Sequence, residues 1–163
     1  MIRQFIASEY CLQCKGCCRF KEADSVWTPC LLEEEVQALL NKKIAGAAIS
    51  RERRLMAVPS PGGEGFICPF LSCRENKCQI YSCRPFECQL YPFLINMRNK
   101  KVFLTVDLNC PYIKERMDTP EFKEYSGYLL CLLNSEPYLE ALKDNPQLLQ
   151  SYEDVARVME LGL

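Results

Sequence analysis

Four cysteines close to the start of the chain follow the pattern C-x-x-C-x-x-C-C; they are Cys11, Cys14, Cys17 and Cys18. Thiol side chains at this spacing are metal ligands far more often than packing residues. A C-x-x-C step lets one turn aim two sulfurs at a single ion, while nearby backbone N–H groups offset the charge of the thiolates. The run therefore predicts that this part of the chain folds around a metal.

The composition limits which metal that is. The 163 residues include twelve cysteines and no histidine. Ligation by sulfur alone suits zinc and iron–sulfur clusters, but not magnesium, calcium or manganese. The missing histidine also excludes Cys₂His₂ zinc sites, Rieske centres and cysteine nucleophiles that are activated by histidine.

The terminus and the charge of the chain set expectations for its surroundings. Residues 1–6 have no long apolar segment and no small-residue cleavage site, so they do not match a signal peptide. No stretch approaches the roughly twenty apolar residues of a membrane span. We therefore expect a cytoplasmic protein with reduced thiols.

With a formal net charge of −1, the chain has no basic field for nucleic acid. We expect neither nucleic acid nor a membrane as a partner, and leave a protein or redox partner unnamed.

The first part of the chain has one clear helix signal. Residues 1–30 show little periodic pattern, and we expect a loop there. Thr28-Pro29 predicts a helix start, with Thr28 as the N-cap. The apolar residues after it are spaced as one helix face: Leu32, Val36, Leu39 and Leu40. A second short helix is predicted over about residues 47–56.

Later segments alternate between strand and helix signals. Two apolar segments, residues 93–97 and 102–106, flank a polar stretch, which predicts a β-hairpin. Three proline-led helix starts follow, at Thr119-Pro120, Ser135-Glu136-Pro137 and Asn145-Pro146. An apolar stripe over residues 148–159 predicts that the last segment is also helical.

These elements predict an α+β fold, with a small cysteine-ligated metal core and a short β-hairpin. Several helices pack around them, including a C-terminal helical segment. A chain of this length suits one compact domain with an appended tail. We place a cysteine-cluster metal-binding domain at residues 1–112, and a helical C-terminal extension packed on the same domain at residues 113–163.

The adjacent pair of cysteines bears on the number of metal centres. Bacterial ferredoxins begin with the same spacing as Cys11, Cys14 and Cys17, but here an immediate Cys18 replaces their later fourth cysteine. Neighbouring side chains of an extended backbone point to opposite sides. Cys17 and Cys18 would then serve two different centres, whereas a tight turn would bring both to one.

Further cysteines recur every five residues, at Cys68, Cys73, Cys78, Cys83 and Cys88. On a helix this spacing would rotate successive sulfurs by about 140°, so they would not converge. Pro69 and Arg84-Pro85 lie among them and favour turns instead.

Three motifs together carry a family resemblance: Cys11-x-x-Cys14-x-x-Cys17-Cys18, Cys68-Pro69-Phe70-Leu71 and Cys78-Gln79-Ile80-Tyr81-x-x-Arg84-Pro85-x-x-Cys88-x-x-Tyr91-Pro92. In combination they closely resemble the CxxCxxCC cysteine-cluster family, a zinc- or iron-chelating domain that is also called the YkgJ type. The resemblance spans roughly residues 11–112 and leaves the tail outside it.

The resemblance implies a set of metal ligands: Cys11, Cys14, Cys17, Cys18, Cys68, Cys78, Cys88 and Cys110. Eight is the number of thiolates that two four-thiolate centres need. Cys73 and Cys83 fall at positions that the family leaves variable, and Cys30 and Cys131 lie in helical context. We expect these four to pack as small hydrophobic side chains.

A charge argument adds one more candidate. A four-thiolate zinc site or a [4Fe–4S] cluster carries a net charge of about −2, which nearby cations must offset. Arg84 lies among the ligands, and we expect it to bind the cofactor by donating to sulfur; its alternative is an ordinary surface arginine.

Three functional classes follow. The favoured one is an iron–sulfur protein with one or two clusters, of the [4Fe–4S] type, in a redox or electron-transfer role that includes a link to modification of a partner. A structural zinc module without catalysis and a metal chaperone or storage protein are the alternatives. Whether the chain is an enzyme, such as an Fe–S oxidoreductase, stays open, because no substrate pocket or nucleotide loop is evident in the sequence.

Overall fold

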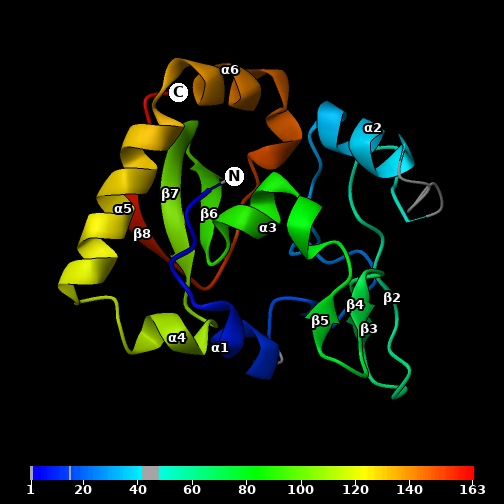
Figure 1. The fold of residues 1–163 in the computed structure, drawn as a ribbon. Helices are drawn as coiled ribbons and strands as arrows, with labels where there is room; N and C mark the ends of the chain where they lie inside the picture. The colour runs from blue at the N-terminus through cyan, green and yellow to red at the C-terminus, as the bar shows by residue number, and fades with distance from the viewer. Residues whose placement is uncertain (1, 15, 42–47) are drawn as a thin grey trace. The chain divides into compact units, whose positions relative to one another are not determined.

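The chain forms two compact units in the computed structural model, which describes residues 2–14, 16–41 and 48–163. We call Ile6–Gln89 the cysteine unit, and Met1–Phe5 together with Leu90–Leu163 the sheet unit. The fold class is α+β, as predicted, with six α-helices and small antiparallel sheets among the described residues (Figure 1).

The twelve cysteines divide unevenly between the units. The cysteine unit holds ten of them, and the sheet unit holds Cys110 and Cys131. The chain passes from one unit to the other twice, between Phe5 and Ile6 and between Gln89 and Leu90. The division at residues 112 and 113, which follows the extent of the family motifs, stays a prediction.

The predicted hairpin is confirmed in the sheet unit. Strands β6 (Phe93–Arg98) and β7 (Lys101–Asp107) pair antiparallel, with Arg98 opposite Lys101. Asn99 and Lys100 form the turn, with φ angles of 51° and 62°. Two consecutive positive φ angles give the turn the twist that two-residue hairpins favour.

The predicted last helix is wrong. Only the 3₁₀ turn η2 (Pro146–Leu148) follows Asn145, and the chain then ends in strand β8 (Val155–Glu160). β8 pairs antiparallel with β7, so the sheet order is β6-β7-β8. The apolar stripe fitted a helix, but pairing with the unprotected edge of β7 satisfies the backbone of this segment, and its β-branched valines suit a strand.

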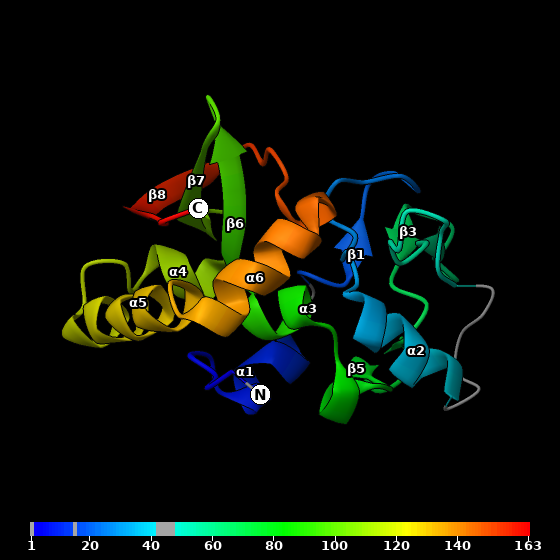
Figure 2. The ribbon, with the colours of Figure 1, turned by 90° about the horizontal axis from the view of Figure 1, so that it is seen from above.

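Two helices of the sheet unit begin where prolines predicted them: α5 (Pro120–Leu133) and α6 (Glu136–Asp144). The short helix α4 (Pro111–Lys114) was not predicted from the sequence. Thr119 caps α5 by accepting the N–H of Phe122 at 3.2 Å. In Figure 2 these helices lie on one side of the sheet. Phe93 of that face stacks on Phe122, with ring centroids 5.4 Å apart, and Phe5 packs edge-on against Phe93.

Short elements make up the cysteine unit: α1 (Ser8–Gln13), β1 (Arg19–Phe20), α2 (Glu33–Asn41), β2 (Val58–Pro59), β3 (Phe66–Ile67), β4 (Leu71–Ser72), β5 (Lys77–Cys78), the 3₁₀ turn η1 (Tyr81–Cys83) and α3 (Phe86–Leu90). Its apolar core gathers side chains from most of them, including Phe20, Leu31, Leu39, Leu55 and Phe70. Because these elements are so short, this unit depends on turns and side-chain contacts more than on long ladders.

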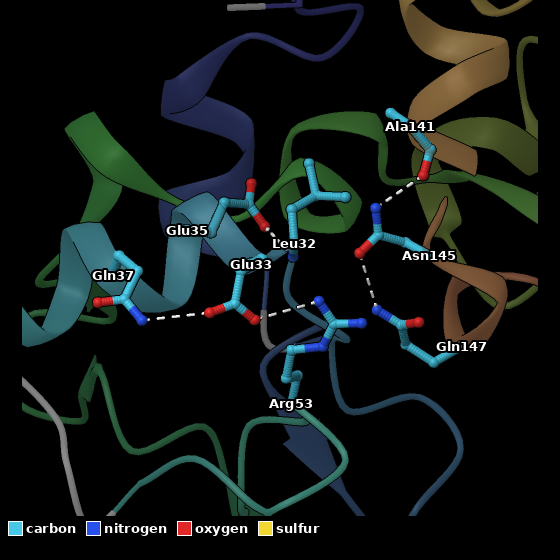
Figure 3. A network of polar contacts seen from close by, with 8 residues as sticks. All are labelled: Leu32, Glu33, Glu35, Gln37, Arg53, Ala141, Asn145 and Gln147. Carbon is cyan, nitrogen blue, oxygen red and sulfur yellow. Dashed lines mark hydrogen bonds and ion pairs between the residues drawn. The ribbon is translucent and has the colours of Figure 1, made fainter. Parts of the chain in front are cut away.

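Three local predictions in the cysteine unit need correction. The opening segment is not all loop, because Cys11 lies in α1. Helix α2 begins after Leu32, not at Thr28: the Glu35 carboxylate reaches back to accept the Leu32 N–H at 2.9 Å, as Figure 3 shows. Leu40, expected on the buried face, is 41% exposed.

The predicted short helix at 47–56 is also wrong over the described residues 48–56. The chain there makes a tight turn in which Ser50 N–H donates to the Arg54 carbonyl at 2.8 Å. Arg53, with a φ of 59°, occupies the left-handed region. A left-handed residue ends a helix, and Ser50 accepts nearby backbone N–H groups that a helix would have paired.

Candidate metal centre

Strand pairing brings the two halves of the cysteine pattern together. β1 pairs antiparallel with β3, and the Cys68 N–H extends this ladder by donating to the Cys18 carbonyl at 3.0 Å. Gly65 permits this approach: with a φ of 66°, a Cβ there would stand 2.7 Å from the Phe20 carbonyl oxygen. Cys18 and Cys68 are fifty positions apart in the chain, but they directly flank the paired strands β1 and β3 and are therefore neighbours.

A small hairpin returns Cys78 to Cys68. β4 pairs with β5, which places Leu71 opposite Cys78. The Leu71 N–H donates to the Cys68 carbonyl at 3.0 Å, and the Gln79 N–H donates to the Phe70 carbonyl at 2.8 Å. Turns, favoured in the sequence by the prolines among these cysteines, are thus found between Cys68 and Cys78.

Two buried or half-buried carboxylates hold the start of α3, which carries Cys88. Glu35 accepts the Phe86 N–H at 2.5 Å in addition to that of Leu32. Glu87 accepts the Cys30 N–H at 2.6 Å. Helix α3 has only five residues, so these contacts with other segments are needed to fix it.

Asn76 connects the opening cysteine run to the β4–β5 turn. Its Nδ2 group donates to the carbonyls of Leu12 at 2.5 Å and Cys14 at 2.8 Å. Its Oδ1 accepts from the Arg19 guanidinium at 2.8 Å. Asn76 has a φ of 50°, which asparagine tolerates better than most residues. The Asn76 side chain therefore contacts the C-x-x-C-x-x-C-C segment near its start, at Leu12 and Cys14, and just after its end, at Arg19.

Four thiols form a mutually interacting set, which we call the cysteine quartet: Cys18, Cys68, Cys78 and Cys88. Each member lies within range of the charge of the other three, because all six pairs interact electrostatically. An ionised Cys18 raises the pKa of each of its three partners. Thiolates this close repel one another unless a cation lies among them.

Burial and backbone donors act in opposite directions on the quartet. Burial raises the pKa of Cys68 to about 12, and it raises the pKa of Cys88 well above its ordinary value. The Phe70 N–H donates to the Cys68 sulfur and the Ile80 N–H donates to the Cys78 sulfur, and each bond lowers the pKa of its thiol. In both cases the donor lies two residues after the cysteine, as in the knuckles that hold metals through thiolates.

The adjacent pair does not point to opposite sides. The Cys17 thiol donates a hydrogen bond to Cys18, which raises the pKa of Cys17 and, as its largest effect on Cys18, lowers that pKa to about 7. Turn geometry after Gly16, whose carbonyl accepts the Arg19 N–H at 3.0 Å, brings the two sulfurs together. The expectation of diverging side chains therefore fails, and with it the geometric argument for two centres.

Two arginines offset the charge of the quartet. Arg84 and Arg19 both lower the pKa of Cys18, and Arg84 also lowers that of Cys78. The Arg84 guanidinium stacks over the Tyr81 ring at 4.1 Å. The backbone carbonyl of Arg84 accepts a hydrogen bond from the Gln89 side-chain amide at 2.9 Å. Arg84 thus stands within electrostatic reach of the thiols. Arg19 was missed in the sequence, although its place directly after Cys18 is a signal.

The remaining predicted ligands lie in different surroundings. Cys11 interacts electrostatically with Cys17. The Cys14 sulfur is close to Gly16: a Cβ atom added to this glycine would lie 3.4 Å from it. Cys110 is buried in the sheet unit at the start of α4. The roles of all three as ligands stay predictions.

The four cysteines expected to be packing residues differ from one another. Cys30 is buried, as expected, and Cys83 packs against the core of the cysteine unit. Cys73 and Cys131 are exposed, so the expectation is wrong for these two. Cys83 also raises the pKa of Cys78, so Cys83 is a neighbour of the quartet. The family pattern gave no sign of this, because it leaves the position of Cys83 variable.

The donor set fits a metal–thiolate centre in chemistry and in connectivity. All twelve cysteines lie within the described residues, and none is joined in a disulfide. Across the described ranges, no three cysteine, aspartate or glutamate side chains converge closely enough to hold one ion. The quartet is therefore a set of neighbouring thiols with backbone donors and two cations beside it, and its sulfurs do not converge on one point.

Comparisons with known proteins agree with this site. The CxxCxxCC family, described as "Putative zinc- or iron-chelating domain", matches residues 10–111. No curated protein and no solved structure shows significant similarity to the chain. Within the described residues, no helix is both long and apolar enough to cross a membrane. The family match covers more than half of the chain and includes the whole quartet, and the chain therefore belongs to the CxxCxxCC family of cysteine-ligated metal-binding domains.

Proposed function

We propose that this chain is an iron–sulfur protein with a redox or electron-transfer role, in which the cysteine quartet holds a [4Fe–4S] cluster. The observation that supports this most is the mutual interaction of all six thiol pairs in the quartet. Four thiolates are what one such cluster needs. The ferredoxin-like spacing of the opening run favours iron over zinc.

The residues around the quartet would suit such a centre in three ways. The N–H groups of Phe70 and Ile80 donate to sulfur and stabilise thiolate charge. Arg19 and Arg84 offset further negative charge. The apolar side chains that pack around Cys18, Cys68 and Cys78 would limit the access of water.

A bound [4Fe–4S] cluster supplies one-electron chemistry, and the chain's residues set how readily it occurs. Reduction adds negative charge, which Arg84 and Arg19 would stabilise, while burial of the quartet opposes it. Cys11, Cys14, Cys17 and Cys110 remain candidates for a second centre. The redox partner, and any partner that the protein modifies, are left unnamed, and we expect the protein in the cytoplasm.

Metal and sulfide analysis tests the proposal. Protein purified without oxygen from iron-replete cells should be brown, and should contain iron and acid-labile sulfide in similar amounts. Colourless protein with stoichiometric zinc would overturn the iron–sulfur assignment in favour of a structural zinc module, which the same quartet chemistry also suits. Variable and exchangeable metal content would instead favour a chaperone or storage role.

A set of matched cysteine variants tests the ligand assignment. Cys88→Ser should lose most of the bound metal, because it removes one thiolate of the quartet. Cys14→Ser should also reduce the metal content, as the family pattern implies. Cys131→Ser is the control, since Cys131 is exposed in the sheet unit. Equal metal loss in all three variants would refute the assignment.

A further inference from the structure

A fifth thiol lies beside the cysteine quartet, at a position that the family motifs do not assign. Cys83 ends the 3₁₀ turn η1 and follows Cys78 by five residues. Both side chains are partly buried and pack against the apolar core of the cysteine unit, which also includes Cys68. Cys83 therefore has the same apolar surroundings as part of the quartet.

Backbone hydrogen bonds fold the chain between Cys78 and Cys83 back on itself. The Ile80 N–H donates to the Cys78 sulfur, and the Ile80 carbonyl accepts the Cys83 N–H at 2.9 Å. Ile80 is 3% exposed, so both contacts are held by a residue of the core. The charge of Cys83 acts on Cys78, as expected for two thiols that a turn keeps close.

The turn that carries Cys83 is anchored at both ends. At its start, the Tyr81 hydroxyl shares a hydrogen bond of 2.9 Å with the Ser8 hydroxyl. Just after its end, the Arg84 guanidinium stacks over the Tyr81 ring at 4.1 Å. The positive charge of Arg84 also acts on Cys78. Because Arg84 directly follows Cys83 in the chain, this cation is near both thiols.

The quartet and Cys83 together offer five thiols, one more than a single centre needs. A [4Fe–4S] cluster and a tetrahedral zinc site each take four thiolates. Across the described residues, no three such side chains converge closely enough to hold one ion. Binding must therefore draw the sulfurs together, and Cys78 and Cys83 both lie in the short segment that moves.

We propose that Cys83 is a reserve ligand of the metal centre, which takes the metal position of Cys78 when the bond to Cys78 breaks. In this exchange the metal–sulfur bond to Cys78 is lost and one to Cys83 forms. The proton that leaves the Cys83 thiol passes to the Cys78 thiolate, so neither the charge nor the oxidation state of the centre changes. The inference rests on the quartet as the metal site of the proposed function, but not on which metal the quartet holds.

Release of iron to a chelator tests the reserve ligand in a variant that keeps all four quartet thiols. A thiol held five residues away has a high local concentration and recaptures the metal before it escapes. Cys83→Ala should therefore lose iron to excess chelator about tenfold faster than the wild type, without oxygen. Cys73→Ala is the matched control and should release iron at the wild-type rate. Cys73 lies five residues before Cys78, but it is exposed in the turn between β4 and β5 (Figure 1).

Metal content tests the replacement of Cys78 itself. Cys78→Ala leaves no hydroxyl that could bind metal, and should keep at least about half of the wild-type iron, because Cys83 supplies the fourth thiolate. Cys78→Ala/Cys83→Ala should keep about a tenth or less. Cys73→Ala/Cys78→Ala should match Cys78→Ala. Equal iron in Cys78→Ala and the Cys78/Cys83 double variant would overturn the proposal, as would an unchanged release rate in Cys83→Ala.

The wild type separates a failure of the reserve ligand from a failure of the proposed function. Zinc in place of iron and sulfide would overturn the iron–sulfur assignment, and the same variants would then test the reserve ligand by zinc content and zinc release. Brown wild-type protein with an unchanged release rate in Cys83→Ala would overturn the reserve ligand alone. A wild type that binds neither metal would overturn both.

Discussion

Replacing Asn76 by aspartate should weaken metal binding without removing any ligand. Aspartate has nearly the same shape and tolerates the left-handed φ of 50°, so the turn can keep its backbone. The carboxylate cannot donate to the carbonyls of Leu12 and Cys14, which Asn76 now contacts at 2.5 and 2.8 Å. The Arg19 contact would survive as an ion pair.

The size of the effect follows from these contacts. Two lost hydrogen bonds, at about 1 kcal/mol each, and the repulsion between the carboxylate and two carbonyls together cost about 3 kcal/mol. The new ion pair with Arg19 returns about 1 kcal/mol, since the site is only half-buried. A net loss of about 2 kcal/mol corresponds to about thirtyfold weaker metal binding, if the opening cysteine run must be held in place to bind.

Competition with a coloured chelator under anaerobic conditions measures this affinity. Asn99→Asp is the matched control, because Asn99 also has a positive φ, of 51°, and lies in a turn of the other unit. Wild-type affinity in Asn76→Asp would refute the reasoning. So would an equal loss of affinity in Asn99→Asp, because the effect would then come from charge alone.

Two further predictions concern Arg84 and Glu35. Arg84→Gln should keep its iron but lower the reduction potential by on the order of tens of millivolts, because a cation near the thiols favours the reduced state; an unchanged potential in voltammetry would contradict this. Burial raises the pKa of Glu35 to about 7, so the folded protein binds this proton more tightly than the unfolded chain. The contribution of this proton to the free energy of unfolding should therefore be fully present below about pH 4.5. It should be lost as the pH rises through 7. In urea denaturation of the metal-free protein, the wild type should lose about 2 kcal/mol between about pH 5 and pH 6.5, while Glu35→Gln stays flat. No histidine titrates in this window, so an equal slope in both proteins would remove Glu35 as the cause.

Features encoded by adjacent residues could be predicted from the sequence. The β6–β7 hairpin has its turn residues between two apolar segments, and α5 has Thr119 and Pro120 at its start. The ligand candidates came from cysteine spacing and from the family motifs. Each of these signals is local, or is a pattern that relatives share.

Features set by distant partners could not be predicted. Strand β8 depends on the free edge of β7, and its apolar stripe alone suits a helix equally well. The start of α2 depends on where the Glu35 carboxylate reaches, not on the Thr28-Pro29 signal. The grouping of the quartet depends on the β1–β3 pairing, which joins segments far apart in the chain.

X-ray absorption at the metal edge of anaerobically purified protein tests the central claim most directly. For a [4Fe–4S] cluster held by the quartet, the iron edge should show a first shell of sulfur alone and a second shell that contains iron. Cys88→Ser should lose this signal, whereas Cys131→Ser should keep it. A first shell of oxygen or nitrogen, or a zinc edge with sulfur neighbours and no second metal, would contradict the account.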